Sequence, residues 1–267
     1  MPPDAKARIL EAAREIGFSL AGVAPAAIPP GADALARWLD QGFEAGMAFM
    51  RRDHAKRADP RALCPWANSV VCVAVSYGDS IGAAPIARYA RGPDYHDVLR
   101  GMLGRLEAAI REVGGEGTRT KACVDTAPIL ERAHARRAGL GWIGKNACLI
   151  HPTLGSRLFL GEILTSLDLA ASTPLPDACG DCRACLEACP TGALVEPHIL
   201  DARRCIAYLT IEHEGAIPED LRPRMGLSVF GCDRCQDACP WNGSESENEL
   251  LHSEKARGGG RIAATCR

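Results

Sequence analysis

The chain has 267 residues, of which 47% are apolar, so it is long enough for one large domain or two smaller ones with a buried core. It contains no uninterrupted apolar run of about 18 residues, and we expect no membrane span. A formal net charge of −2 argues against a sequence-independent nucleic-acid binder, so any RNA contact must rest on the basic segments at 51–61 and 132–137.

The first 170 residues carry the pattern of a mixed α/β domain, beginning with two helices. Asp4 can cap a first helix, which places Ile9 and Ala13 on one apolar face and ends at Gly17. Apolar residues spaced three and four apart predict a second helix around 35–39.

A strand, a third helix and a second strand follow. The near-continuous apolar run at 70–75 is typical of a strand buried on both faces. A third helix carries an apolar stripe from Leu99 to Ile110 and ends at Gly114. Residues 122–124 then predict a short strand with Asp125 at its carboxyl end, the edge where ligands and catalytic groups collect in α/β folds.

A proline-rich linker at 172–176 precedes two groups of cysteines with the ligand spacing of two 4Fe–4S clusters. The first group reads Cys-x2-Cys-x2-Cys-x3-Cys-Pro, and the second, Cys-x2-Cys-x3-Cys-Pro, is one cysteine short. Cys205, on a helix expected over 201–213, can fill the gap. Because the cysteine before each proline ligates the other cluster, the expected ligand sets are Cys179, Cys182, Cys185 with Cys239, and Cys205, Cys232, Cys235 with Cys189.

Two other uses of the cysteines have to be weighed. Structural zinc also binds Cys-x2-Cys pairs, but zinc needs four ligands per site and has no use for the x3-Cys-Pro element. A disulfide framework is disfavoured, because thirteen cysteines in a chain that starts without a signal peptide predict a reducing, cytoplasmic location. Five cysteines show no ligand spacing, and the first four of them are expected to be buried: Cys64, Cys72, Cys123, Cys148 and Cys266.

Two adjacent clusters form an electron path that needs a terminus, and the chain shows neither a dinucleotide fingerprint nor a P-loop. Several segments, in order along the chain, resemble the epoxyqueuosine reductase family from about residue 5 to residue 242. They are RYARGPDYH at 88–96, DTAPILER at 125–132 with AGLGWIGKN at 138–146, CIAYLTIE at 205–212, and GCDRCQDACPWN at 231–242.

The resemblance implies an enzyme that reduces the epoxide of epoxyqueuosine in the wobble position of tRNA, with cobalamin and two 4Fe–4S clusters as cofactors. It implies an α+β or α/β fold, in which a cobalamin-binding α/β domain at 1–173 precedes a ferredoxin-like two-cluster domain at 174–242. The family pattern stops there, and residues 243–267 are expected to form a divergent, disordered tail. We therefore expect the family's helical repeat domain to be missing and tRNA binding to be weakened.

The resemblance also assigns candidate site residues. Asp125 matches the general acid that protonates the leaving epoxide oxygen, although an aspartate there can also cap a turn. Arg52 matches a family arginine that we assign to the cofactor, and Tyr89 and Lys145 are further candidate contacts. Tyr89 can equally pack in a core, and Lys145 can equally be a solvated loop cation or meet tRNA phosphate. The sequence around His96 resembles the Asp-x-His-x-x-Gly motif of His-ligated cobalamin proteins but has leucine for glycine, so we expect no protein histidine on cobalt.

The implied partners are a tRNA carrying epoxyqueuosine, bound through its anticodon stem-loop, and an external electron donor such as a flavodoxin or ferredoxin; a monomer is expected. A respiratory reductive dehalogenase also joins cobalamin to two clusters, but it carries a twin-arginine export signal that this chain does not begin with. A 4Fe–4S electron carrier without its own catalysis is the other alternative. About 170 residues of α/β domain ahead of the clusters argue against it.

Overall fold

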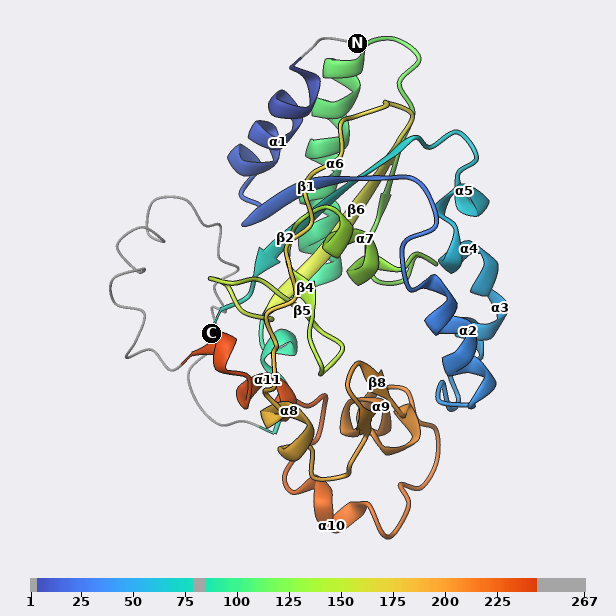
Figure 1. The fold of residues 1–267 in the computed structure, drawn as a ribbon, viewed down its shortest axis with the longest axis vertical. Helices are drawn as coiled ribbons and strands as arrows, with labels where there is room; N and C mark the ends of the chain where they lie inside the picture. Colours follow the sequence, from blue (N-terminus) through green and yellow to red (C-terminus); the bar gives the residue numbers. More distant parts are fainter. Residues whose placement is uncertain (1–3, 79–84, 244–267) are drawn as a thin grey trace.

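The computed structural model describes residues 4–78 and 85–243. Figure 1 shows a sheet flanked by helices in the upper part, and a group of short helices below it. Residues 244–267, where the sequence predicts a disordered tail, lie outside this range, as does Cys266. Within the described residues, no helix combines the length and the apolar character that crossing a bilayer requires.

Four strands form the main sheet: β1 (Leu20–Pro25), β2 (Ser69–Ser76), β6 (Leu158–Thr165) and β3 (Thr120–Cys123), in the order β1-β2-β6-β3. Every neighbouring pair is antiparallel. The fold is therefore a mixed α+β fold, and the α/β alternative is wrong because no strand pair in this sheet is parallel. The sequence pattern placed Asp125 at the carboxyl edge of the sheet, where ligands collect when the strands are parallel. Because this sheet is antiparallel, that reasoning does not explain the position of Asp125.

The sheet lies between two helical layers, because successive side chains of a strand point to opposite faces. Residues 71, 73 and 75 of β2 join the core beneath α1 (Ala5–Ile16) and α6 (Tyr95–Gly114). Residues 70, 72 and 74 join the core beneath α7 (Glu131–Arg137). All six are buried, which confirms the prediction of a strand covered on both faces.

The two long helices, α1 and α6, bury the predicted apolar faces, but the predicted side-chain cap at the start of α1 is not formed. Gly17 follows α1 with φ +106°, and its N–H donates to the last turn, as a glycine that ends a helix does. Asp4 precedes α1, but its side chain makes no capping hydrogen bond. That expectation is wrong because the backbone of Asp4, at φ −105° and ψ 9°, is not in the extended conformation that turns the side chain toward the helix N–H groups.

The other elements are short, and they fall into two groups along the chain. Before the cysteine-rich part they are α2 (Ala32–Asp40), α3 (Ala48–Arg52), α4 (His54–Ala58), α5 (Pro60–Leu63), η1 (Arg88–Ala90), β4 (Trp142–Ile143) and β5 (Leu149–Ile150). Within it they are α8 (Ala184–Glu187), β7 (Leu194–Glu196), β8 (Ile199–Leu200), η2 (Ala202–Arg204), α9 (Ile206–Ile211), α10 (Arg222–Met225), α11 (Arg234–Asp237) and η3 (Pro240–Asn242).

The cysteine-rich part packs against the segment around α2. The Trp38 indole N–H donates to the carbonyl of Leu200 at 2.6 Å. The N–H of Gly46 donates to the hydroxyl of Tyr208 at 2.9 Å, and a Cβ at Gly46 would lie 2.8 Å from that oxygen. These bonds join residues 162 positions apart in the chain, so the two parts of the molecule hold each other in place.

The expected linker at 172–176 is held against the sheet. The N–H of Val23 donates to the Ser172 hydroxyl at 3.0 Å, and the N–H of Ser172 donates to the carbonyl of Val23 at 2.8 Å. The Lys6 ammonium group donates to the carbonyl of Ala171 at 3.0 Å. The start of this connection therefore runs alongside β1 as a fixed part of the structure.

The helix expected over 201–213 is interrupted at Cys205. Asp201 caps η2, the backbone becomes extended at Cys205, and α9 begins only at Ile206. Cys205 thereby occupies the position before α9, where the N–H groups of Ala207 and Tyr208 point at its sulfur. The single-helix prediction is wrong because the extended backbone of Cys205, at φ −74° and ψ 124°, separates η2 from α9.

Glu162 is a polar residue in the middle of β6, fully buried, and neither carboxyl oxygen has a hydrogen-bonding partner among the described residues. Burial raises the pKa of Glu162 well above its usual value, and the charge of Glu131 raises it further. The folded protein therefore favours the protonated form of this carboxyl group.

Replacing Glu162 with methionine is expected to stabilise the protein by about 1–3 kcal/mol, because an unpaired buried polar group is removed at similar volume. The folded pKa is raised, so wild type loses stability as the pH rises above about 4.3, the unfolded value, and the gain grows with pH. Thermal unfolding at pH 6 and pH 8, at matched iron content, measures this. The exposed Glu112→Met variant is the control, and a lower melting temperature for Glu162→Met at both pH values would contradict the expectation.

Candidate functional site

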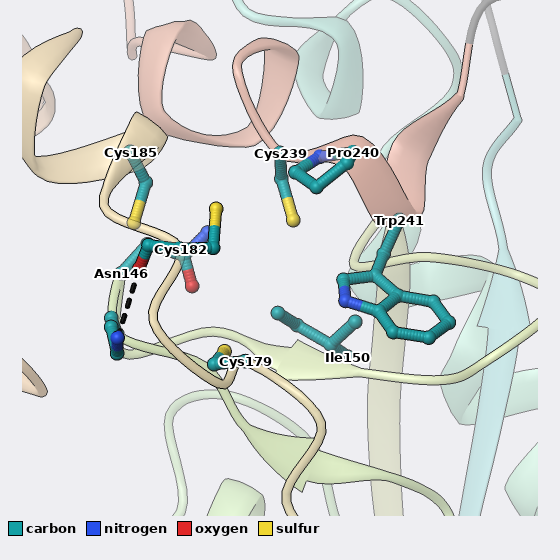
Figure 2. A pocket seen from close by; sticks show the side chains of 9 residues that line it. Asn146, Ile150, Cys179, Cys182, Cys185, Cys239, Pro240 and Trp241 are labelled. Atoms are coloured by element: carbon teal, nitrogen blue, oxygen red, sulfur yellow. Dashed lines mark hydrogen bonds between the residues drawn. The ribbon is translucent and has the colours of Figure 1, made fainter.

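The first predicted set of cysteines lines a cavity, which Figure 2 shows from close by. Sulfur atoms from two separate stretches of chain face the same space. The cavity is lined by Lys145, Asn146, Ile150, Cys179, Cys182, Cys185, Cys239, Pro240 and Trp241. Four thiols around one space, with Cys239 contributed from the second group, are the arrangement that one 4Fe–4S cluster requires.

The turn between β4 and β5 holds the loop of this first set. The Lys145 ammonium group donates to the carbonyls of Gly180 at 2.5 Å and Cys182 at 2.9 Å. The Asn146 side-chain amide donates to the carbonyl of Cys235 at 3.4 Å, so the same turn also contacts the second set. The β4–β5 hairpin therefore fixes both cysteine groups relative to the sheet.

The second set also converges. Burial raises the pKa of the Cys235 thiol, and four nearby thiols, those of Cys148, Cys232, Cys205 and Cys189, raise it further. The Cys189 sulfur accepts a hydrogen bond from the N–H of Ala193 at 3.3 Å. Such bonds to ligand sulfurs are one of the factors that set the reduction potential of a cluster.

Cys148 lies between the two sets. Burial raises the pKa of its thiol, and Cys239, Cys185 and Cys205 are close enough to raise it further. The residue as a whole is partly exposed, because it lies in the turn between β4 and β5, so the expectation of a buried residue is wrong here. The same expectation is confirmed for Cys64, Cys72 and Cys123.

Asp125 lies in the loop between β3 and α7. Its φ of +45° lies in the left-handed region, which is uncommon for a residue other than glycine. Its side chain is 54% exposed, and its Oδ2 lies 3.1 Å from Nε2 of His96. The other ring nitrogen, Nδ1, lies 2.7 Å from Oδ1 of Asp94. Asp125 therefore faces solvent beside a histidine whose two ring nitrogens both have carboxylate partners.

The ring of His96 is held between these carboxylates and an aromatic stack. Burial disfavours the charged ring, but Asp125 and Asp94 outweigh it and raise the pKa of His96. Tyr95 stacks on His96 at a centroid distance of 4.0 Å and on Phe159 at 4.5 Å. Burial, and then the charge of Asp125, raise the pKa of Tyr95, so its hydroxyl stays protonated beside the carboxylate.

Comparison with known proteins gives these features a context. Residues 57–126 match the family model for "Epoxyqueuosine reductase QueG, DUF1730", and residues 178–242 match that for a "4Fe-4S double cluster binding domain". An epoxyqueuosine reductase from Xanthomonas campestris is 48% identical over 253 residues, covering 90% of this chain and 71% of its own length. The chain belongs to the epoxyqueuosine reductase family. The cysteine-rich part of this family member is accordingly a two-cluster 4Fe–4S domain, which overturns the zinc alternative.

Other relatives agree with the assignment of this epoxyqueuosine reductase. The enzyme of Gloeobacter violaceus is 47% identical, covering 91% of the chain and 77% of its own length. A crystal structure of an epoxyqueuosine reductase with an epoxyqueuosine-modified tRNA-Tyr stem loop superposes with a TM-score of 0.82 at 37% identity, covering 90% of this chain and 66% of that one. The chain thus spans about two thirds to three quarters of the length of these relatives.

Two further sets of solved structures bear on the fold of this reductase. A Bacillus subtilis epoxyqueuosine reductase, with a TM-score of 0.78 and 35% identity, has its catalytic aspartate loop swung out of the active site. Reductive dehalogenase structures reach a TM-score of 0.55 at 16–17% identity and share the fold alone.

The structure of the reductase adds two residues that sequence reasoning missed. Glu131, the first residue of α7, accepts a hydrogen bond from the N–H of Asp125 at 2.6 Å. Arg57 is buried, and although burial lowers the pKa of its guanidinium, the charges of Asp53, Glu131 and Asp125 act on it in the opposite direction. Arg57 appears in the sequence only as one of several basic residues, so nothing in the spacing singled it out.

The predicted cofactor contacts of the reductase occupy three different settings. Arg52 is 75% exposed and pairs with Asp53 at 3.2 Å. Tyr89 is half-buried and its ring centroid lies 6.1 Å from that of Tyr95. Lys145 reaches the loop of the first cysteine set, as described above. The structure brings Tyr89 close to Asp125, whose charge raises the pKa of Tyr89 after burial does, and the cobalamin roles of all three stay predictions.

Proposed function

We propose that this chain reduces epoxyqueuosine to queuosine in the wobble position of tRNA. The reaction removes one oxygen from an epoxide as water and leaves a carbon–carbon double bond, which takes two electrons and two protons. The observation that carries the proposal is a combination found in one structure. The carboxyl group of Asp125 is half-exposed in a loop, and two sets of four cysteines have their thiols close together. Relatives of this family carry the activity in their names.

Electrons would reach the site through two 4Fe–4S clusters. The first would be held by Cys179, Cys182, Cys185 and Cys239, and the second by Cys189, Cys205, Cys232 and Cys235. Support comes from the cavity that the first four line and from the mutual proximity of the second four. An external donor such as a flavodoxin or ferredoxin would supply the electrons to a monomeric enzyme.

The residues near Asp125 fit a cobalamin bound without a histidine ligand, because both ring nitrogens of His96 already face carboxylates. Bound cobalamin would supply reducing equivalents to the substrate carbon. Arg52, Tyr89 and Lys145 are the proposed contacts, of which Tyr89 has the strongest support through its position next to Tyr95. The cobalamin-binding domain would be residues 1–173 and the cluster domain residues 174–242.

The cobalt environment gives a test that does not depend on turnover. In the cob(II)alamin form of the bound protein, we expect an EPR spectrum unchanged by His96→Ala, since no ring nitrogen of His96 is free for cobalt. His151→Ala, in a ring that contacts Thr153 instead, is the matched control. Nitrogen superhyperfine splitting that disappears only in His96→Ala would show that His96 is a ligand.

Asp125 would donate a proton to the leaving oxygen, because an alkoxide is a poor leaving group. His96 orients the carboxyl group from one side, and the Asp125 N–H is held by Glu131 from the other. The left-handed backbone at Asp125 is the kind of local strain that clusters at active sites. Support for Asp125 thus rests on its exposure, its two polar partners and its backbone.

The partner is proposed to be a tRNA carrying epoxyqueuosine, bound through its anticodon stem-loop; the related crystal structure contains an epoxyqueuosine-modified tRNA stem loop. The basic segment at 51–61 is largely paired within the protein, since Arg51 contacts Glu44, Lys56 contacts Asp53, and Arg61 contacts Asp59. Phosphate contacts therefore have to compete with these ion pairs, and we expect binding to weaken steeply with salt.

The proposal is tested by anaerobic reconstitution with iron, sulfide and cobalamin, followed by an assay on tRNA that contains epoxyqueuosine. Formation of queuosine at a rate that depends on the reductant and on cobalamin is the expected result. Cluster binding with neither corrin absorbance nor turnover would instead favour the electron carrier without its own catalysis. Turnover of an aryl halide but not of the tRNA would favour the dehalogenase alternative.

A further inference from the structure

A carboxylate on a helix reaches back to the loop of the proposed proton donor. Glu131 opens α7, and its Oε1 accepts the backbone N–H of Asp125 at 2.6 Å, which closes the loop formed by residues 126–130. Hydrogen bonds to a charged acceptor are shorter than neutral ones, and this short distance agrees with a carboxylate acceptor. In the part of the chain that the structure describes, Glu131 is the hydrogen-bonding partner of the Asp125 N–H.

The two ends of this bond differ in how firmly they are held. The helix α7 is anchored by buried Ala135, which packs in the core beneath the sheet, and by Arg132, which donates to the carbonyl of Ala147. Asp125 lies two residues beyond the end of β3, has a positive φ, and exposes more than half of its side chain. The bond therefore connects a fixed helix to a loop whose conformation is unfavourable by itself.

The surroundings of Glu131 keep its carboxyl group close to the charge of Asp125. Burial, and then that charge, raise the pKa of Glu131 to about 7, whereas the Asp125 N–H, Arg132 and Arg57 favour the carboxylate. Beneath it lies Glu162, fully buried and without a partner. A pH of 8 favours the carboxylate over the protonated form, and in either form a carboxyl oxygen can accept the Asp125 N–H.

We infer that Glu131 is the positioning residue of the donor: it holds the Asp125 loop so that the Asp125 carboxyl group stays beside His96 and faces the substrate side. This inference rests on the proposed role of Asp125. In the Bacillus subtilis relative, the catalytic aspartate loop is swung out of the active site. A hydrogen bond that restrains such a loop would therefore oppose this movement. Glu131 itself touches neither the substrate nor the departing oxygen in this arrangement.

The test compares Glu131→Gln with Glu131→Ala in the reconstituted enzyme at pH 8. Glutamine keeps an oxygen that can accept the Asp125 N–H, and alanine removes it. Hydrogen exchange resolved to single amides should be about 10-fold faster at Asp125 in Glu131→Ala, the effect of losing one such bond, and close to wild type in Glu131→Gln. Turnover should fall by about 100-fold in Glu131→Ala with an unchanged KM, as for a misplaced catalytic group, and by less than about 5-fold in Glu131→Gln.

Glu107→Ala is the matched control. Glu107 Oε1 accepts the N–H of Ala122 at 3.1 Å, so this variant removes a bond of the same kind, three residues earlier. It should speed exchange at Ala122 and leave exchange at Asp125 and turnover unchanged. Wild-type exchange at Asp125 in Glu131→Ala would overturn the inference, as would a Glu131→Gln variant as impaired in turnover as Glu131→Ala.

The exchange measurement needs no tRNA and no turnover, so it separates two kinds of failure. If wild type makes no queuosine but Glu131→Ala still frees the Asp125 amide, the proposed function fails and the loop restraint stands. If wild type is active and Glu131→Ala keeps normal kcat, the restraint does not position the donor and the inference fails.

Discussion

Asp125→Asn is expected to lower turnover by about two to four orders of magnitude, the range that general acid catalysis supplies. Asparagine keeps the shape of the side chain and still accepts a hydrogen bond from His96, but it has no proton to give to the leaving oxygen. Iron and cobalamin content should match wild type, because neither depends on this proton. Single-turnover assays on epoxyqueuosine-containing tRNA, with the cofactors reduced in advance, isolate the step.

Asp97→Asn is the control for this prediction. Asp97 lies in the first turn of α6, near the site in sequence, but its side chain is 78% exposed and pairs only with Arg100 in the described structure. It should retain wild-type turnover. Near-normal turnover of Asp125→Asn with intact cofactors would move the donor role to Tyr89, Tyr95 or a bound water and leave Asp125 as a turn residue.

Cys205→Ala is expected to remove one cluster of two and to abolish turnover. Cys205 supplies the ligand that the second group of cysteines lacks, so iron should fall from about eight to about four per chain. The cluster with Cys179 and Cys239 should remain, because its cavity is built from other residues. Iron and acid-labile sulfide analysis measures the cluster content of wild type and of the variant. In EPR of the reduced protein, the signals of two interacting clusters should become those of one.

Cys148→Ala is the control for this prediction. Cys148 is close to thiols of both sets but has no place in the ligand spacing. Its replacement should cost no iron. If Cys205→Ala kept both clusters while Cys148→Ala lost one, the ligand assignment would have to pass from Cys205 to Cys148.

The parts of the fold that sequence predicts are those whose cause is local. The buried faces of α1 and α6 follow from apolar residues spaced three and four apart, and β2 follows from an apolar run. The direction of the strands was not predictable in the same way. Whether β3 runs parallel or antiparallel to β6 depends on contacts between segments about 40 residues apart, and no residue in either strand signals it.

The same division holds for the site. The cysteine sets could be assigned because cluster ligation requires a fixed spacing along the chain. Arg57 and Glu131 could not, because their roles come from their positions next to Asp125, which arise only when α4 and α7 take their places in the folded chain. Cys205 shows the intermediate case: its role as a ligand followed from counting, but the break in the helix around it followed from backbone geometry.

The contacts between the segment around α2 and the cysteine-rich part have a consequence for how the cell handles this protein. Trp38 and Gly46 each bond to a part of the chain that needs its clusters in order to fold. In iron-starved cells these groups would lose their partners, and the apolar surface shared with Tyr208 and Leu209 would open to proteases. Iron supply would then set the abundance of the protein as well as its activity, because chains that fail to load clusters would be degraded.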